Sequence, residues 1–556
     1  MLLCERASSR TFKSAGVTRG CRKAAESIGR RDCAPKGGSQ QSLSAGSAGL
    51  VPSDPARSKT VPRCCAQGAN LARRRPVCVP YSRFMTTPPD TLPLTLGALR
   101  ASGWVRRPIR EELRINLESR LAEGRPLTSS VLGYDDTVLP QLETAILAGH
   151  DIILLGERGQ AKTRIIRSLV ELLDEWMPIV AGSDVRDDPY APISAFGLDR
   201  IRELGDETPI EWVHRSRRFA EKLASPDTSM ADLIGEVDPI KVAGGLYLDD
   251  PRALSYGLVP KSNRGIFAIN ELPDLAERIQ VGLLNVLEER DVQIRGHLVR
   301  LDLDLLVVAT ANPEDYTNRG RLITPLKDRF GSQIRTHYPD DIATEVAIIH
   351  QEAHLATSPK PIIVPWFIDD IVARISHVAR KSHVLNQRSG VSVRLSIANY
   401  ETVVANALRR TLRTGDDEVV PRVSDLSAVV QSTQGKIEVD TMDDADVDQI
   451  IAALVALAVR QSFTDHVLLE EAGEIVEAFT HEVVVHVGDD LPAKDYLQVL
   501  ANLPALEAPA RRVAGPTATA GEMAAAVEFI LEGLHLTKRL AKDASGGRAL
   551  YRTRNR

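Results

Sequence analysis

Cysteine is absent from residues 79–556, because all six cysteines of the 556-residue chain lie earlier. Neither disulfides nor a thiolate metal site can therefore hold the larger part of the chain together. The early cysteines include no C-x-x-C pair, which argues against a zinc module. Long hydrophobic runs are also lacking, since no stretch approaches the roughly 18 consecutive apolar residues of a membrane-spanning helix. We therefore expect a protein of a reducing compartment, located in the cytoplasm, without a membrane span.

Acidic side chains are scarce only at the start of the chain. Residues 1–84 hold 16 Lys and Arg against 4 Asp and Glu, whereas residues 85–556 hold 53 against 70. The first segment thus carries a net charge of +12 and the remainder −17. An acidic body disfavours binding to the phosphate backbone of nucleic acids, which usually requires a basic face.

The basic segment 1–84 has three interpretations. Its Arg-rich, Ser-rich and acid-poor composition is typical of an organellar transit peptide. It is equally typical of a disordered basic arm with too few apolar residues to form a core. The third interpretation is that translation begins at Met85, and of the three we favour this one.

The rest of the chain is expected to form an α/β domain and a helical region. Short apolar runs at 151–155, 265–269 and 303–309 are typical of buried parallel strands. Helical segments between and before these runs, including 107–123 and 139–147, predict crossover connections and a parallel sheet. Beyond Pro339 the strand signals stop and the pattern predicts several helices, one of them over residues 449–462. The last dozen residues, with Gly546-Gly547 and four arginines, read as a frayed tail. The expected regions are a lead-in with a helix (85–130), an α/β domain (131–340), a helical lid (341–435) and a helical C-terminal region (436–556).

A glycine-containing octapeptide directly follows the first predicted strand. A phosphate-binding loop needs small residues, so that backbone N–H groups can approach the phosphates, and a helix after it. The Lys162 ammonium can then reach the β- and γ-phosphates, and the Thr163 hydroxyl can ligate Mg²⁺. Ala161 stands where the pattern has its last glycine, and we expect it in right-handed helical dihedrals, without strain. A plain glycine turn is the alternative, but the octapeptide favours a site for ATP and Mg²⁺. Its residues are Gly156, Glu157, Arg158, Gly159, Gln160, Ala161, Lys162 and Thr163.

The second apolar run ends in Asn270-Glu271. A nucleotide site of this kind places one carboxylate near Mg²⁺ and another where it can polarise the attacking water. Glu271 is the candidate general base. Asn270 can accept a hydrogen bond from metal-bound water, but it adds no negative charge. An ordinary strand end with polar surface residues is the alternative.

Two further polar residues follow the third run. Asn312 is placed to orient water against a γ-phosphate, although Asn312-Pro313 alone would indicate only a turn. Arg329 can reach a phosphate in a neighbouring subunit, as arginine fingers do. A local ion pair between Asp328 and Arg329 is the alternative for this segment.

These four features, in this order, resemble the AAA+ ATPases over about residues 130–435. The branch with the MoxR ATPases and the magnesium-chelatase I subunits is most similar, because its members often have alanine before the loop lysine. Its inserted β-hairpin looks like residues 287–296, and its enlarged insertions look like 183–262. Its sensor strand and Asp-Arg-Phe-Gly segment resemble Asn312-Pro313-Glu314 and residues 326–331. Arg394 matches the family's second sensor arginine, whereas Asn270 stands where the family usually has aspartate.

The resemblance implies an ATP-hydrolysing motor that works as a ring, with six subunits expected. Arg329 would act across the subunit boundary, and Arg394 would sense the γ-phosphate from the lid. The implied job is chelatase-like or MoxR-like remodelling, or metal insertion, with a von Willebrand A-type partner protein.

Two other classes stay open. One is a sigma-54-activator-like or nucleic-acid motor on the same fold, which the acidic body and the missing Gly-Ala-Phe-Thr-Gly-Ala loop disfavour. The other is a nucleotide-dependent scaffold with little hydrolysis, which Asn270 makes conceivable.

Overall fold

The structure is a computed structural model, and it leaves part of the chain undescribed. The basic segment 1–84, Met85, residues 289–296 of the expected hairpin, and Pro313-Glu314 lie outside the described residues. The described residues are 88–89, 91–247, 250–288, 301–312, 321–386, 390–439, 446–479, 483–488, 490–545 and 548–554.

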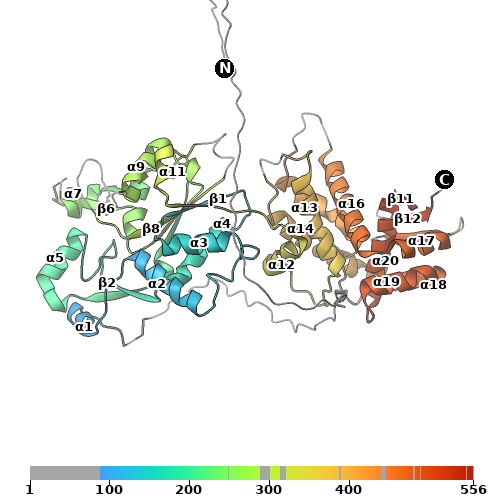
Figure 1. Cartoon of the computed structure of the whole chain (residues 1–556), viewed down its shortest axis with the longest axis horizontal. Coiled ribbons are helices and arrows are strands. Elements are labelled where there is room, and N and C mark those ends of the chain that lie inside the picture. Colours follow the sequence, from blue (N-terminus) through green and yellow to red (C-terminus); the bar gives the residue numbers. More distant parts are fainter. Residues whose placement is uncertain are drawn as a thin grey trace, which may run out of the picture. The chain divides into compact units, whose positions relative to one another are not determined.

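A five-stranded parallel sheet forms the centre of the α/β domain (Figure 1). Its strand order is β4-β7-β8-β1-β9, and each neighbouring pair is parallel. The three central strands are buried along their whole length, which is why they stand out as continuous apolar runs. The predicted α/β domain with a parallel sheet is confirmed. The strands are β1 (Ile152–Leu155), β4 (Phe219–Leu223), β7 (Gly265–Asn270), β8 (Leu305–Ala311) and β9 (Ser332–Arg335).

Helices cover both faces of this sheet (Figure 1). One hydrophobic core lies under α2 (Ile109–Ala122), α3 (Val138–Leu147) and α4 (Lys162–Ser168). A second core on the other face lies under α9 (Glu277–Glu288) and α11 (Thr324–Arg329). The helices expected at 107–123 and 139–147 are therefore confirmed as α2 and α3.

Two small antiparallel pairs lie outside the parallel sheet, β2 with β3 and β5 with β6. Most of these elements fall within residues 183–262, the stretch interpreted as an insertion. The strands are β2 (Trp176–Val180), β3 (Ile210–His214), β5 (Gly235–Val237) and β6 (Leu254–Tyr256). The accompanying helices are α1 (Leu96–Ala101), α5 (Ala195–Leu204), α6 (Met230–Leu233), α7 (Pro239–Ala243) and α8 (Leu258–Lys261).

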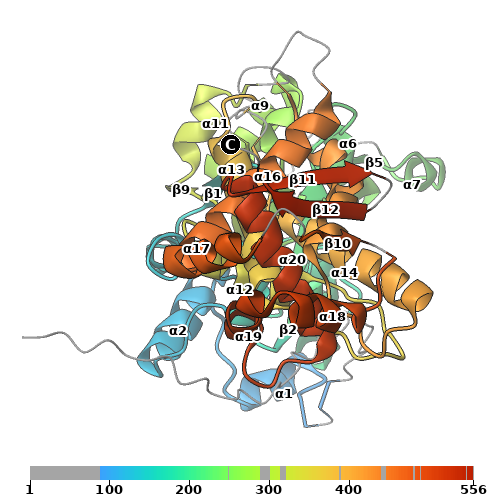
Figure 2. The ribbon, with the colours of Figure 1, turned by 90° about the vertical axis from the view of Figure 1, so that its right-hand side faces the viewer.

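The lid and the C-terminal region share one hydrophobic core, which runs from Ile349 to Tyr551 across the expected boundary at 435/436. Phe367 in the lid stacks on Phe529 with ring centroids 4.6 Å apart. Helix α20 runs through the middle of the C-terminal part and is buried on nearly all sides (Figure 2). The predicted helical character of both regions is confirmed. The helices are α12 (Ile342–Glu352), α13 (Trp366–Lys381), α14 (Arg394–Thr414), α15 (Val429–Thr433), α16 (Val447–His466), α17 (Leu469–Ala478), α18 (Asp495–Asn502), α19 (Glu507–Ala514) and α20 (Ala520–Leu536).

The C-terminal region also contains an antiparallel sheet in the order β10-β12-β11, which corrects two expectations. Strand signals do not stop at Pro339, and half of the presumed frayed tail, residues 548–553, is a strand. The antiparallel pairing of β11 with β12 makes this segment a hairpin, and a glycine pair in the sequence is a common hairpin signal. The strands are β10 (Val485–Gly488), β11 (Leu540–Ser545) and β12 (Arg548–Thr553).

Helix α16 is the single described helix that is long and apolar enough, by length and composition, to cross a membrane. Core helices of folded domains pass the same test. Here Ile451, Leu454 and Phe463 of α16 belong to the hydrophobic core shared with the lid.

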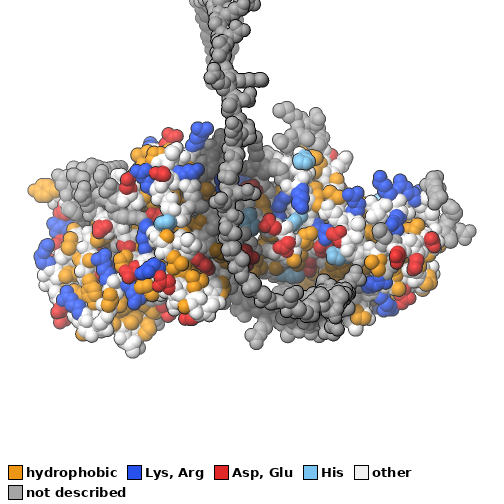
Figure 3. Space-filling view, in the orientation of Figure 1, with side chains coloured by type: hydrophobic (Ala, Val, Ile, Leu, Met, Phe, Trp, Pro, Cys, Tyr) orange, Lys and Arg blue, Asp and Glu red, His pale blue; other side chains and the backbone are white. Residues whose placement is uncertain are grey.

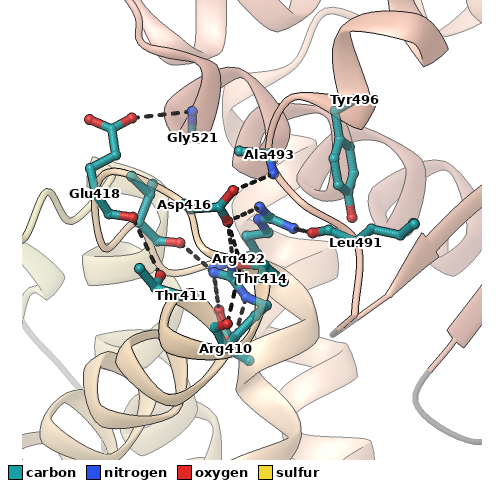
Figure 4. A network of polar contacts seen from close by, with 12 residues as sticks. Arg410, Thr411, Thr414, Asp416, Glu418, Arg422, Leu491, Ala493, Tyr496 and Gly521 are labelled. Carbon is teal, nitrogen blue, oxygen red and sulfur yellow. Dashed lines mark hydrogen bonds and ion pairs between the residues drawn. The ribbon is translucent and has the colours of Figure 1, made fainter.

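A buried polar network joins the end of α14 to the C-terminal region (Figure 4). One carboxylate oxygen of Asp416 lies 3.4 Å from Arg422 Nη2 and 3.6 Å from Arg410 Nη1. Its other oxygen accepts a hydrogen bond of 2.8 Å from the Ala493 backbone. Arg422 in turn donates to the Leu491 carbonyl at 2.9 Å. The network thus connects segments about 70 residues apart in the sequence.

Candidate functional site

A cavity of about 880 Å³ opens at the carboxyl ends of β1, β7 and β8. Its volume lies within the range of small-molecule and cofactor sites. Gly156 and Glu157 adjoin it through the loop, whereas Arg329 is not part of its lining. The cavity therefore brings together ten of the predicted site residues: Arg158, Gly159, Gln160, Ala161, Lys162, Thr163, Asn270, Glu271, Asn312 and Arg394.

The loop between β1 and α4 is held by side chains from outside it. Gln160 Oε1 accepts hydrogen bonds from the Glu157 backbone at 3.0 Å and from Thr336 Oγ1 at 2.6 Å. A Cβ at Gly156 would lie 1.9 Å from Thr336 Oγ1, so this position requires glycine. Burial raises the pKa of the Tyr134 phenol well above its usual range. The phenol therefore stays protonated, and it donates to the Gln160 carbonyl at 2.9 Å.

Ala161 adopts left-handed dihedrals, with φ 53° and ψ 14°. The expectation of right-handed dihedrals without strain is wrong. Helix α4 begins one residue later, at Lys162, and Ala161 is the turn that precedes it. The last glycine of the usual pattern is thus explained in this structure by backbone geometry, since glycine takes this conformation without a Cβ clash.

The free energy of unfolding of the Ala161→Gly variant is expected to equal that of the parent chain or to exceed it by up to about 1.5 kcal/mol. Glycine removes about 1–2 kcal/mol of left-handed strain from the folded state. Its greater conformational freedom in the unfolded chain offsets about 0.4–1 kcal/mol of that stabilisation. Thermal or denaturant unfolding measures the change. Ala148→Gly is the matched control, because Ala148 has right-handed dihedrals at the end of α3 and should lose stability. A loss at Ala161 as large as at Ala148 would contradict the strain.

Lys162 lies at the centre of the loop. Its ammonium donates to the Gly156 and Glu157 carbonyls and to Asn312 Oδ1, the last at 2.9 Å. The expected lysine and the expected water-orienting amide, 150 residues apart in the sequence, are therefore direct neighbours. Asn312 is buried and follows β8 immediately.

The tips of β7 and β8 are joined by a short hydrogen-bond chain. The Glu271 backbone donates to Thr310 Oγ1 at 3.0 Å, and that hydroxyl donates to Asn270 Oδ1 at 3.3 Å. Glu271 has a left-handed backbone with φ 55°, at the turn that ends β7. Asn270 Nδ2 donates to Glu221 Oε1 at 2.5 Å. Glu221 also lines the cavity, and sequence analysis missed it because its edge strand β4 carries no continuous apolar run.

The lid reaches the cavity through the start of α14. The exposed Arg394 lines it, and its backbone N–H donates to Ser392 Oγ at 3.1 Å. A Cβ at Gly159 would collide with Ser392, so the loop and the lid are in close contact. Tyr338, just before the lid, adds a second link, because its hydroxyl donates to the Arg158 carbonyl at 2.8 Å and the Arg380 guanidinium of the lid lies 4.5 Å from its ring centroid.

Arg329 lies on α11 and pairs with Glu288 of α9, with Nη2 2.6 Å from Oε2. The alternative of a local ion pair with Asp328 is therefore not what this structure contains. The pair is partly exposed, with 30% of the Arg329 side chain accessible.

The oxygen donors at the cavity suit a nucleotide-held Mg²⁺ better than a resident metal. Within the described ranges, no group of three or more His, Cys, Asp or Glu side chains is arranged to hold a metal ion. Mg²⁺ is commonly bound by one or two protein oxygens together with substrate phosphates and water. Thr163 and Asn270 line the same cavity as the loop, so the residues present fit that arrangement.

Comparison with known proteins finds relatives that are magnesium-chelatase subunits. The magnesium-chelatase subunit ChlI of Anabaena variabilis is 29% identical over 214 residues, which are 37% of this chain and 59% of that protein. The chloroplastic subunit ChlI-1 of Arabidopsis thaliana is 27% identical over 249 residues, 42% of this chain and 53% of that protein. The chain thus spans only between half and three fifths of the length of these relatives.

The similar solved structures have low TM-scores, and no family model matches the chain. A complex of the magnesium-chelatase subunits BchI and BchD has a TM-score of 0.32 and 20% identity, over 60% of this chain and 95% of that one. NtrX from Brucella abortus in complex with ATP has a TM-score of 0.30 and 14% identity, over 74% of this chain and 72% of that one.

Proposed function

Because the chain is an AAA+ protein of the magnesium-chelatase I branch, we propose that it binds ATP in this cavity and hydrolyses it. The contact of Lys162 Nζ with Asn312 Oδ1 supports this most directly, since it joins the loop to the strand end beside Glu271. Lys162 and the loop amides would hold the phosphates. Thr163 and Asn270 would hold Mg²⁺, which would offset phosphate charge.

Glu271 is the proposed base that takes a proton from the attacking water, and Asn312 orients that water. Arg394 contacts the γ-phosphate from the lid. Arg329 serves a neighbouring subunit, which requires a ring, and we propose a hexamer. Glu288, the ion-pair partner of Arg329 in this structure, is half exposed. Arg329 can therefore leave this ion pair for a phosphate of the neighbouring subunit at little cost.

The proposed work is remodelling or metal insertion in the cytoplasm, together with a von Willebrand A-type partner protein. The nucleic-acid alternative has little support from the surface. On the face shown in Figure 3, Lys and Arg side chains are interspersed with Asp and Glu rather than gathered in one stripe.

ATP turnover by the purified chain, compared with Lys162→Ala, tests the proposal. Removing the ammonium should weaken ATP binding at least about 100-fold, because charge-assisted hydrogen bonds to the phosphates are lost. Binding of a fluorescent ATP analogue and release of phosphate are the two readouts. Equal turnover in both proteins would overturn the assignment, and binding without turnover in the parent chain would indicate a scaffold.

A further inference from the structure

Glu221 is a cavity-lining carboxylate without a role in the site described so far. It lies on β4, whose residues run parallel to β7, with Glu221 opposite Ala268 and Leu223 opposite Asn270. Its side chain is 21% exposed and lines the same cavity as Lys162.

The contacts of Glu221 place it between Asn270 and the first helix after the loop. Its Oε1 accepts from Asn270 Nδ2 at 2.5 Å. The same carboxylate forms a two-pronged ion pair with Arg167, with Nε at 2.8 Å and Nη2 at 3.1 Å. Arg167 follows Thr163 by four residues on α4, so both side chains lie on one face of that helix. Glu221 therefore contacts Asn270 directly and, through Arg167, adjoins the helix face that carries Thr163.

The neutral amide at position 270 suits this neighbour. An aspartate there would bring a second carboxylate to within hydrogen-bond distance of Glu221, and two such groups cannot both ionise cheaply. Asparagine instead donates through Nδ2, which fixes its amide and leaves Oδ1 as the acceptor. The charge missing from β7 is thus present on the adjacent strand.

We propose that Glu221 supplies the negative charge that Asn270 lacks at the nucleotide-bound Mg²⁺. It orients the Asn270 amide and attracts the hydrated cation, so that the acidic pair of the usual site is divided between β4 and β7. Arg167, 63% exposed, is the counter-ion of Glu221 when no cation competes for it. The inference rests on the proposed function, because it concerns the cation that accompanies ATP.

The test measures the Mg²⁺ dependence of nucleotide binding rather than turnover. The full chain is titrated with MgCl₂ at fixed fluorescent ATP analogue, and Mn²⁺ binding with ADP is followed by electron paramagnetic resonance. Glu221→Gln should raise the half-saturating Mg²⁺ concentration about tenfold, since it removes a charge-assisted contact to the hydrated ion. Affinity for the analogue in EDTA should not fall. Arg167→Gln should shift the Mg²⁺ midpoint in the opposite direction, which misfolding would not do.

Two further variants complete the test. Glu171→Gln is the matched control, because Glu171 forms an exposed pair with Arg120 away from the cavity, and it should leave the midpoint unchanged. The double variant Asn270→Asp/Glu221→Gln moves the charge back to β7 and should restore the midpoint.

Either of two results would overturn the inference alone: a parent-like midpoint in Glu221→Gln, or a double variant no better than Glu221→Gln. A parent chain that binds no nucleotide would overturn the proposed function as well.

Discussion

Replacing Glu271 by glutamine is expected to lower ATP turnover by about 10²–10⁴-fold while ATP binding is retained. The amide keeps the size of the side chain and its place at the end of β7, but it cannot accept the proton of the attacking water. Because Lys162 and the loop remain intact, the affinity for ATP should change little. Single-turnover phosphate release and binding of a fluorescent ATP analogue separate the two effects.

Glu277→Gln is the control for this prediction. Glu277 lies in the first turn of α9, six residues beyond Glu271, and is exposed outside the cavity lining. Its turnover should equal that of the parent chain. A Glu271 variant that hydrolyses ATP at the parent rate would remove Glu271 from the chemistry and would favour another carboxylate, with Glu221 the first to examine.

The parts of the site that could be predicted from the sequence are those that form short, continuous sequence motifs. The octapeptide, Asn270-Glu271 and Asn312 each follow an apolar run, and runs buried on both faces are easy to recognise. Carboxyl ends of parallel strands meet at one edge of a sheet, so these residues could be expected to converge. The contact between Lys162 and Asn312 agrees with that expectation.

The parts that could not be predicted depend on partners far apart in the chain. Glu221 meets Asn270 only because β4 joins the sheet next to β7, and edge strands carry weaker patterns. The left-handed turn at Ala161 could not be predicted, because alanine is a helix former and the sequence there gives no sign of a left-handed residue. The hairpin after α20 was hidden because its glycine pair and arginines are also typical of a tail.

The junction between the lid and the C-terminal region could not be predicted either, because the contacts that join the two regions link Arg422 with Leu491 and Asp416 with Ala493, about 70 residues apart. Arg410 is 3% exposed and pairs with Asp425, while Arg422 is 1% exposed and lies over the Tyr496 ring at 4.8 Å. Buried arginines of this kind need carboxylates, because an unpaired buried charge is costly. Asp416 serves both arginines at once (Figure 4).

Asp416→Asn is therefore expected to destabilise the shared core of the lid and C-terminal region by about 3 kcal/mol, the lower end for breaking a buried pair. The lower end applies because Arg410 keeps Asp425 as a partner. For a core of this size the loss corresponds to a fall in melting temperature on the order of 6–12 °C. Differential scanning calorimetry of the full chain measures the change.

The neighbouring residue provides the matched control for Asp416. Asp417 carries the same side chain one position later, but it is 89% exposed and faces Lys494 at 3.8 Å. Asp417→Asn should leave the melting temperature unchanged, because exposed pairs contribute little. If both variants melted alike, the network would be a surface feature without structural weight. If only Asp416→Asn lowered the melting temperature, the buried network would be a structural link between the lid and the C-terminal region.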